Sequence, residues 1–322
     1  MKAPKLIVVA ALLVTAVLPL GCRNRPTGIA VIPRTTATLL WEPMHLGVAE
    51  AAHGSGLSLY WNAPADEGDT EKQLNLYSAV RTEDYRGIIF APDETLASRS
   101  IVLQTVKSGT PVVIVDDKLG PPPGQLLSYV SSDEVIGSTL ASQRLGQVLQ
   151  GHGNIAIIGI NPRSEGSLSR EEDFEKALAV TAPNIHVTIR RFGDTVITHQ
   201  QQIAQEIMNR PDHVDAIIAL TSAATRGAYY AKLVSEPSSH VVILGFDQDL
   251  LLPLQTGDVD SIVVQDTREI GRIAMRNLQA QMRGETVEGI TLVPPILLTR
   301  ENLNSPAITR LWEFPLYRWS DL

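Results

Sequence analysis

The chain alternates between short apolar runs and segments with helical spacing, and this alternation restricts its fold more than any other feature. Segments such as 69–80 and 198–210 carry apolar residues at helical spacing. Strands that alternate with helices form βαβ units, and strands apolar on both faces indicate parallel sheets covered by helices on both sides. We therefore predict an α/β fold with doubly wound parallel sheets. The expected strands are 28–33, 57–61, 87–92, 111–117, 154–160, 186–192, 215–220, 240–246 and 261–265.

The strand pattern also repeats, which predicts two similar lobes. A first set of four expected strands ends in "TPVVIVDD", and a second set of four ends in "SHVVILGFDQD". Ligands of open parallel sheets bind outside the carboxyl ends of the strands. We therefore expect Asp116 and Asp117 at the edge of one sheet and Phe246 and Asp247 at the edge of the other. Two such edges facing each other would form a cleft.

The first residues indicate export. Lys2 and Lys5 precede an apolar stretch, 6–20, and "LPLGC" follows and ends at Cys22. The stretch is short for a membrane span, and a small residue precedes the cysteine. It resembles a bacterial lipoprotein signal, in which the cysteine is acylated and becomes the mature N-terminus. We thus assign 1–22 to a signal peptide with a lipobox and 23–27 to a tether; an ordinary signal peptide or an N-terminal anchor helix are the alternatives.

Composition excludes several classes of protein. Cys22 is the only cysteine, so the fold has no intramolecular disulfide. Loss of the two lysines of the signal would take the formal charge from −8 to −10, which argues against nucleic-acid binding. The sequence "GHGNIA" precedes an expected strand instead of following one, so it does not indicate dinucleotide binding. The seven histidines have no metal-ligand spacing, and no catalytic motif is present. We expect no cofactor and no metal.

An ordered set of segments carries a family resemblance. The series "GIAVIP", "LLWEPMHLGVAEAA", "GIIFAP", "TPVVIVDD", "YVSSDEVIGS", "GNIAIIGI", "SREEDFEKAL", "VDAIIAL", "VVILGFDQD" and "SIVVQDTREIG" resembles the type I periplasmic sugar-binding proteins. The resemblance implies two lobes that close on a ligand and are joined by three crossings, near Ser131–Asp133, Asp260–Val264 and Gly289–Val293. It divides the chain into an N-terminal lobe, 28–131 plus 263–291, and a C-terminal lobe, 132–262 plus 292–322.

The resemblance also implies a set of ligand contacts. Aromatic rings suit the C–H face of a sugar, while charged and amide groups suit its hydroxyls. Asp117 and Arg34 depart from the family pattern, since ribose-type binders carry arginine and a small polar residue there. Arg34 either faces the Asp116–Asp117 pair or indicates a ligand with another hydroxyl pattern or charge. Leu40, where a second ring is common, departs as well. The implied contacts are Arg34, Trp41, Asp116, Asp117, Arg170, Thr221, Phe246, Asp247 and Gln265.

Each of these residues also has an ordinary structural interpretation. Trp41 and Phe246 are equally suited to core packing. Asp116 and Asp117 are suited to capping a helix N-terminus, as acids after a strand often do. Arg170 can pair with the acids at 171–173 on a solvated face.

We predict a monomeric, lipid-anchored solute-binding protein on the periplasmic side of the cell envelope. It would capture a small sugar-like ligand for an ABC transporter permease and would perform no covalent chemistry. A membrane sensor or kinase partner and an exported cleft enzyme are the alternatives. The aromatic residues of segment 299–322 either pack on the second lobe or form a partner surface.

Overall fold

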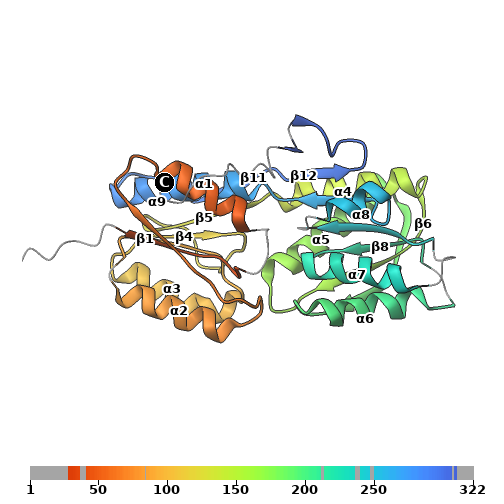
Figure 1. Ribbon diagram of the computed structural model, residues 1–322, viewed down its shortest axis with the longest axis horizontal. Helices are drawn as coiled ribbons and strands as arrows, with labels where there is room; N and C mark the ends of the chain where they lie inside the picture. Colours follow the sequence, from red (N-terminus) through yellow and green to blue (C-terminus); the bar gives the residue numbers. More distant parts are fainter. Residues whose placement is uncertain are drawn as a thin grey trace, which may run out of the picture.

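The computed structural model describes residues 28–36, 41–83, 85–211, 214–235, 240–246, 250–306 and 308–309. They form two α/β lobes that lie side by side (Figure 1). The first lobe contains β1 (Gly28–Ile32), α1 (Glu42–Ala52), β2 (Ser58–Trp61), α2 (Thr70–Thr82), β3 (Ile88–Phe90), α3 (Thr95–Lys107), β4 (Val112–Val115), β5 (Leu127–Ser132), α9 (Thr267–Met282) and β11 (Ile290–Val293). The second contains α4 (Glu134–Val148), β6 (His152–Ile160), α5 (Glu165–Thr181), β7 (Asn184–Phe192), α6 (Ile197–Met208), β8 (Ala216–Ala219), α7 (Ser222–Val234), β9 (Val242–Phe246), α8 (Leu251–Thr256), β10 (Ser261–Val264) and β12 (Ile296–Thr299).

The sheet of the first lobe is parallel throughout, with strand order β11-β5-β4-β3-β1-β2. Successive side chains of a strand point to opposite faces, so each strand contributes to two cores. In β1, Ile29 and Val31 pack with α1 and α9, whereas Ala30 and Ile32 pack with α2 and α3. Figure 1 shows these two helix pairs on opposite sides of the sheet. The continuously apolar strands thus reflect burial on both faces.

The second sheet follows the same plan, with strand order β12-β10-β9-β8-β6-β7. All its pairs are parallel except β10 with β12, which is antiparallel. Helices α4 and α5 cover one face, and α6, α7 and α8 cover the other. The prediction of two doubly wound α/β lobes is confirmed. No helix within the described residues has both the length and the apolarity needed to cross a bilayer.

All nine expected strands are present, but each sheet also contains strands that the pattern did not predict. These are β5, β11 and β12. Three of the six residues of β5 are serines, and β11 is partly exposed, so neither reads as a continuous apolar run. Each of the two sets of four expected strands therefore forms part of a six-stranded sheet.

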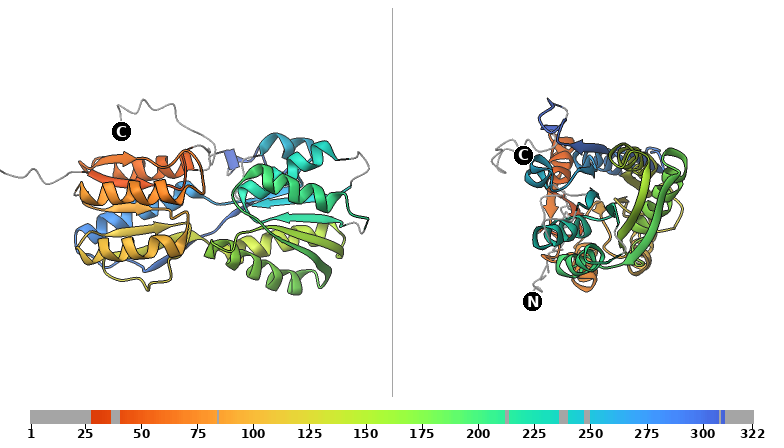
Figure 2. Two further views of the ribbon diagram at one scale, coloured as in Figure 1. Left: turned by 90° about the horizontal axis from the view of Figure 1, so that it is seen from below. Right: turned by 90° about the vertical axis from the view of Figure 1, so that its right-hand side faces the viewer.

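Three segments connect the lobes, and Figure 2 shows the narrow connection between them. The chain crosses at Asp133, between β5 and α4, at 265–266, between β10 and α9, and at 294–295, between β11 and β12. The predicted lobe boundaries at 131/132, 262/263 and 291/292 come one or two residues too early, because they divide β5, β10 and β11. Prolines 294 and 295 follow β11 directly, and proline cannot donate to a strand ladder. The predicted signal 1–22, tether 23–27 and aromatic residues 312–319 lie outside the described residues.

Close packing of α1 on α9 holds the first lobe together and fixes the start of α1. Gly47 of α1 faces the backbone of α9 so closely that a Cβ there would overlap the carbonyl oxygen of Arg268. Gly271 of α9 faces the carbonyl oxygen of Met44 in the same way. Helix α9 belongs to the chain segment that returns from the second lobe, so this contact closes the lobe. It also sets the position of Trp41, which immediately precedes α1 and makes no side-chain capping bond to it.

Gly47→Ala should destabilise the protein by about 1–3 kcal/mol, because the overlap with backbone atoms exceeds the gain in helix propensity. Chemical denaturation followed by circular dichroism measures this loss. Gly124→Ala is the matched control, because a Cβ at Gly124 meets open space. Equal stability of the two variants would contradict the close packing of α1 and α9.

Candidate ligand-binding cleft

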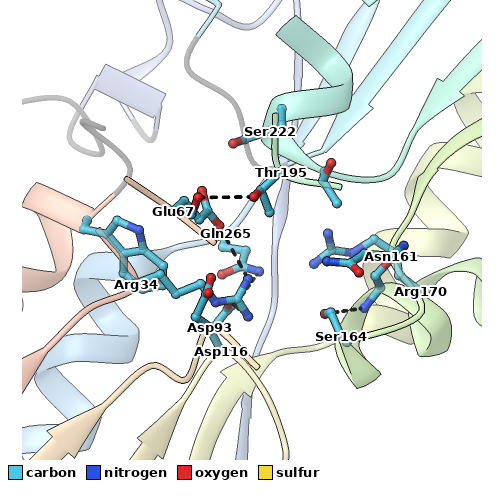
Figure 3. A pocket seen from close by; sticks show the side chains of 15 residues that line it. Arg34, Glu67, Asp93, Asp116, Asn161, Ser164, Arg170, Thr195, Ser222 and Gln265 are labelled. Carbon is cyan, nitrogen blue, oxygen red and sulfur yellow. Dashed lines mark hydrogen bonds and ion pairs between the residues drawn. The ribbon is translucent and has the colours of Figure 1, made fainter. Parts of the chain in front are cut away.

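A polar cleft lies between the lobes, at the carboxyl ends of strands from both sheets. Figure 3 shows Arg34, Glu67, Asp93 and Asp116 on the side of the first lobe, and Asn161, Ser164 and Arg170 on the side of the second. Gln265, at a crossing segment, lies between them. The lining residues are Arg34, Trp41, Glu67, Asp93, Asp116, Asn161, Ser164, Gly166, Ser167, Arg170, Thr195, Thr221, Ser222, Ala223 and Gln265.

Arg34 is the centre of the charge network on the first lobe. Its Nη2 lies 2.8 Å from Asp116 Oδ2 and 3.0 Å from Asp117 Oδ2, and its Nε donates to the carbonyl oxygen of Pro92 at 3.1 Å. Burial alone would lower the pKa of Arg34, but Asp116, Asp117 and Glu67 outweigh it and raise that pKa above its usual range. The guanidinium therefore stays charged and joins the ends of β1, β3 and β4.

Asp116 sits in a backbone conformation that L residues rarely adopt. Its φ is 71°, in the left-handed region, where aspartate is tolerated better than most residues. This turn directs the carboxylate toward Arg34 and toward Gln265, whose Nε2 donates to Asp116 Oδ1 at 2.9 Å. The contact links the first lobe to a crossing segment between the lobes. Such strained residues occur often at binding sites.

Buried hydrogen bonds hold the loop that carries Glu67. Gln73 of α2 donates to the carbonyl oxygens of Pro33 and Ala91, and its Oε1 accepts from the backbone N–H of Asp93. The Asp93 carboxylate in turn accepts from Gly68 N–H at 3.0 Å and from Thr70 Oγ1 at 2.8 Å. The ends of β1 and β3 and the loop before α2 thus form one rigid wall.

Asp117 does not line the cleft itself but bridges the two lobes behind it. Its Oδ1 accepts from the backbone N–H of Gly166 at 2.7 Å, and its Oδ2 accepts from Ser164 Oγ at 3.3 Å. Both donors lie at the start of α5, where unpaired N–H groups and the helix dipole favour an anion. Burial raises the pKa of Asp117, and the charge of Arg34 offsets only part of that rise.

Arg170 lines the cleft, but its guanidinium is already occupied within the second lobe. Its Nε and Nη2 donate to Glu134 at 2.6 and 2.8 Å, and its Nη1 donates to the carbonyl oxygen of Leu220 at 2.6 Å. These bonds join Arg170 to α4, and its predicted contact with a ligand stays a prediction. The alternative of pairing with the acids at 171–173 on a solvated face is wrong, because Arg170 is buried.

The two predicted rings have different positions. Phe246 is 1 % exposed and belongs to the core under α4 and α5, with the Arg170 guanidinium 5.1 Å from its ring centroid. The expectation that it contacts ligand is corrected, because its strand turns this side chain to the helix-covered face. Trp41 lines the cleft and also packs on the first core. Its Nε1 is buried and has no hydrogen-bond partner among the described residues.

Thr221 and Gln265 both line the cleft, and Thr221 also caps α7 by accepting from Ala224 N–H. Asp247, Leu40 and Cys22 lie outside the described residues, so their predicted roles remain predictions. The sequence interpretation missed Glu67, Asp93, Asn161, Ser164, Thr195 and Ser222, among others. Asp93 and Asn161 follow β3 and β6 closely, so the strand-end rule that selected Asp116 would have found them. Glu67 and Thr195 lie on loops and have no such signal.

The cleft offers hydrogen-bonding groups of both kinds. Asn161, Ser222 and Gln265 can both donate and accept, as a polyhydroxylated ligand requires, and the Trp41 ring adds an apolar surface. Within the described part of the chain, no group of three or more His, Cys, Asp or Glu side chains is arranged to hold a metal ion. This arrangement suits recognition of a small polar molecule.

Comparisons with known proteins agree with this geometry. A family model described as "Periplasmic binding protein domain" matches residues 29–286. The D-allose-binding periplasmic protein of Escherichia coli K12 is 24 % identical over 84 % of this chain and 91 % of its own length. A putative rhizopine-binding protein of Rhizobium meliloti is 26 % identical, over 85 % and 89 %.

A solved structure shares the fold. The carbohydrate transporter solute binding protein of Agrobacterium radiobacter, in complex with D-arabinose, superposes with a TM-score of 0.80 at 22 % identity and covers 88 % of this chain and 98 % of its own. The family match spans most of the chain and both lobes. The chain therefore belongs to the periplasmic binding protein family, as a solute-binding protein with the two-lobed type I fold.

Proposed function

We propose that this protein is exported and captures a small sugar or sugar-like ligand in the cleft between its lobes, for delivery to an ABC importer. The observation that carries the proposal is the cleft itself, in which hydroxyl, amide and charged groups from both lobes surround one apolar ring, Trp41. The relatives are binding proteins for allose and, putatively, rhizopine, and the structural neighbour holds arabinose. The chain performs no covalent chemistry in this proposal.

A thermal-shift screen of the chain from residue 23 onward, against pentoses, hexoses, amino sugars, sugar acids and polyols, tests the proposal. A ligand that binds only the folded protein must raise the melting temperature. Trp41→Ala should weaken binding of the identified ligand by about tenfold or more, because it removes the apolar face of the site.

Trp61→Ala is the matched control, since Trp61 stacks on His45 with ring centroids 4.2 Å apart and does not line the cleft. Calorimetric titration of both variants gives the two affinities. Equal losses in the two variants would show that Trp41 acts through folding alone. A screen in which no member of these classes shifts the melting temperature would refute the proposed ligand class.

We also propose that the contact between Asp117 and α5 stabilises the closed arrangement of the lobes. Two further contacts connect the lobes around the cleft: Arg163 Nη1 lies 2.9 Å from Glu94 Oε1, and Thr195 Oγ1 donates to the carbonyl oxygen of Glu67 at 3.3 Å. The Arg163–Glu94 pair is solvated and contributes little. Asp117 is buried and accepts a charge-assisted bond from Gly166, so it contributes most.

Gly166→Ala should hinder closure, because a Cβ at this position would lie 2.8 Å from Asp117 Oδ1. We expect weaker ligand binding and less compaction by small-angle scattering at saturating ligand than in the unmodified protein, with the lobes themselves intact. Gly124→Ala serves again as the control. Unchanged affinity and unchanged compaction in Gly166→Ala would refute a closure role for this contact.

We propose in addition that Cys22 carries a lipid anchor that holds the protein at the membrane. The support is the resemblance of residues 1–22 to a lipoprotein signal. Cys22→Ser should abolish incorporation of labelled palmitate, and the folded lobes should retain their ligand affinity because the anchor precedes β1. Persistent labelling of the variant would contradict the anchor.

A further inference from the structure

Among the described residues in and around the cleft, acidic groups outnumber basic groups. Both arginines are matched within the protein: Arg34 by Asp116 and Asp117, and Arg170 by Glu134. Glu67 and Asp93 also line the cleft. Among the described residues, two guanidinium groups therefore stand against five carboxylates that line the cleft or pair with its arginines, a formal excess of three negative charges. The adjoining cavity on the hinge side adds Lys118 against Asp133, Glu165 and Asp173, so it does not restore the balance.

Glu67 is the carboxylate with the fewest partners. Asp93 accepts two hydrogen bonds from neutral donors, whereas the charged partner of Glu67 among the described residues is Arg34, whose Nη1 lies 3.8 Å from Oε1 and which also pairs with Asp116 and Asp117. Burial raises the pKa of Glu67, the charge and hydrogen bond of Arg34 offset part of this rise, and Asp93 and Asp116 raise the pKa further. Desolvation and neighbouring negative charges both raise the free energy of a charged carboxylate, unless a cation binds next to it.

A metal ion does not account for this site. Within the described residues no cluster of carboxylate, histidine or cysteine side chains has the geometry to hold one. The cleft instead combines carboxylates with an indole ring and several hydroxyl and amide groups. Indole rings attract organic cations as well as C–H surfaces.

We propose that the ligand of this cleft is a polyhydroxylated molecule that carries an ammonium group, such as an amino sugar or amino polyol, with the ammonium bound at Glu67. The proposal rests on the proposed function and narrows its ligand class. The ammonium offsets the charge of Glu67, and the hydroxyls pair with groups such as Gln265, Asn161 and Ser222. A neutral sugar would leave the excess charge of the cleft in place.

Matched ligand sets test the charge independently of the sugar skeleton. Glucose, glucosamine and N-acetylglucosamine form one set, with the corresponding galactose and mannose sets, and pentaerythritol with Tris forms a minimal pair. Within the set that binds, calorimetry should show the amine bound about tenfold to a hundredfold more tightly than its neutral members. Glu67→Gln should remove this preference, so that the amine and the neutral member of the set bind the variant with affinities within about twofold of each other.

Asp66→Asn is the matched control, because Asp66 is an exposed neighbour on the same loop and does not line the cleft. It should retain the amine preference. A neutral sugar that binds as well as its amine would overturn the charge inference while the proposed function stands. If no sugar, amine or polyol binds, both the proposed ligand class and this inference are wrong.

A measurement without ligand completes the test. Because the Glu67 carboxylate is unfavourable in the empty cleft, Glu67→Gln should raise the melting temperature at neutral pH, and Asp66→Asn should not. A melting temperature lowered by Glu67→Gln would show that the carboxylate stabilises the fold, and would overturn its assignment as an unmatched ligand group.

Discussion

The ion network of Arg34 with Asp116 and Asp117 is the interaction on which the rest of the site depends. Buried charges are tolerated only when each is paired and hydrogen-bonded, and removal of one partner leaves the other uncompensated. Asp116 links this network to Gln265 at a crossing, and Asp117 extends it to the start of α5 in the other lobe. One guanidinium group thus connects the first lobe, the hinge and the second lobe. Substitution of the arginine alone, or of the two aspartates alone, would break this connection.

The alternation of strands and helices predicted the fold well, because burial on both sheet faces leaves a direct mark on the sequence. Every expected strand is present. Three strands were missed. β5 and β11 contain serines or partly exposed positions, and their places in the sheet depend on pairing with β4 and with each other. The place of β12 depends on antiparallel pairing with β10. Two of the three crossings were misplaced by a few residues for a related reason. An apolar pattern in the sequence indicates that a strand is buried. The lobe to which the strand belongs depends on the strands with which it pairs.

The site was less predictable than the fold, and the reasons lie in particular residues. The rule that ligand groups follow parallel strands located Asp116 and would have located Asp93 and Asn161. It does not specify which face a strand-end side chain takes, so Phe246 was placed in the cleft although it packs in the core. It also cannot show that Glu134 of another helix engages Arg170. Glu67 lies on a loop whose path is set by Asp93 and Gln73, and no local pattern encodes that path.

The position of Glu67 also connects ligand charge to lobe closure. Its carboxylate faces the cleft, while its backbone carbonyl accepts from Thr195 of the second lobe, so one residue contributes to both the ligand site and the interlobe contact. In the closed arrangement the carboxylate is held among other acids, at a free-energy cost that a bound cation removes. A ligand shifts a conformational equilibrium only by its difference in affinity between the two states. An ammonium group at Glu67 has such a difference, because its Coulombic interaction strengthens as closure excludes water. The acid excess would then make closure selective for the charged ligand, since a neutral sugar leaves the cost of assembling these carboxylates in place.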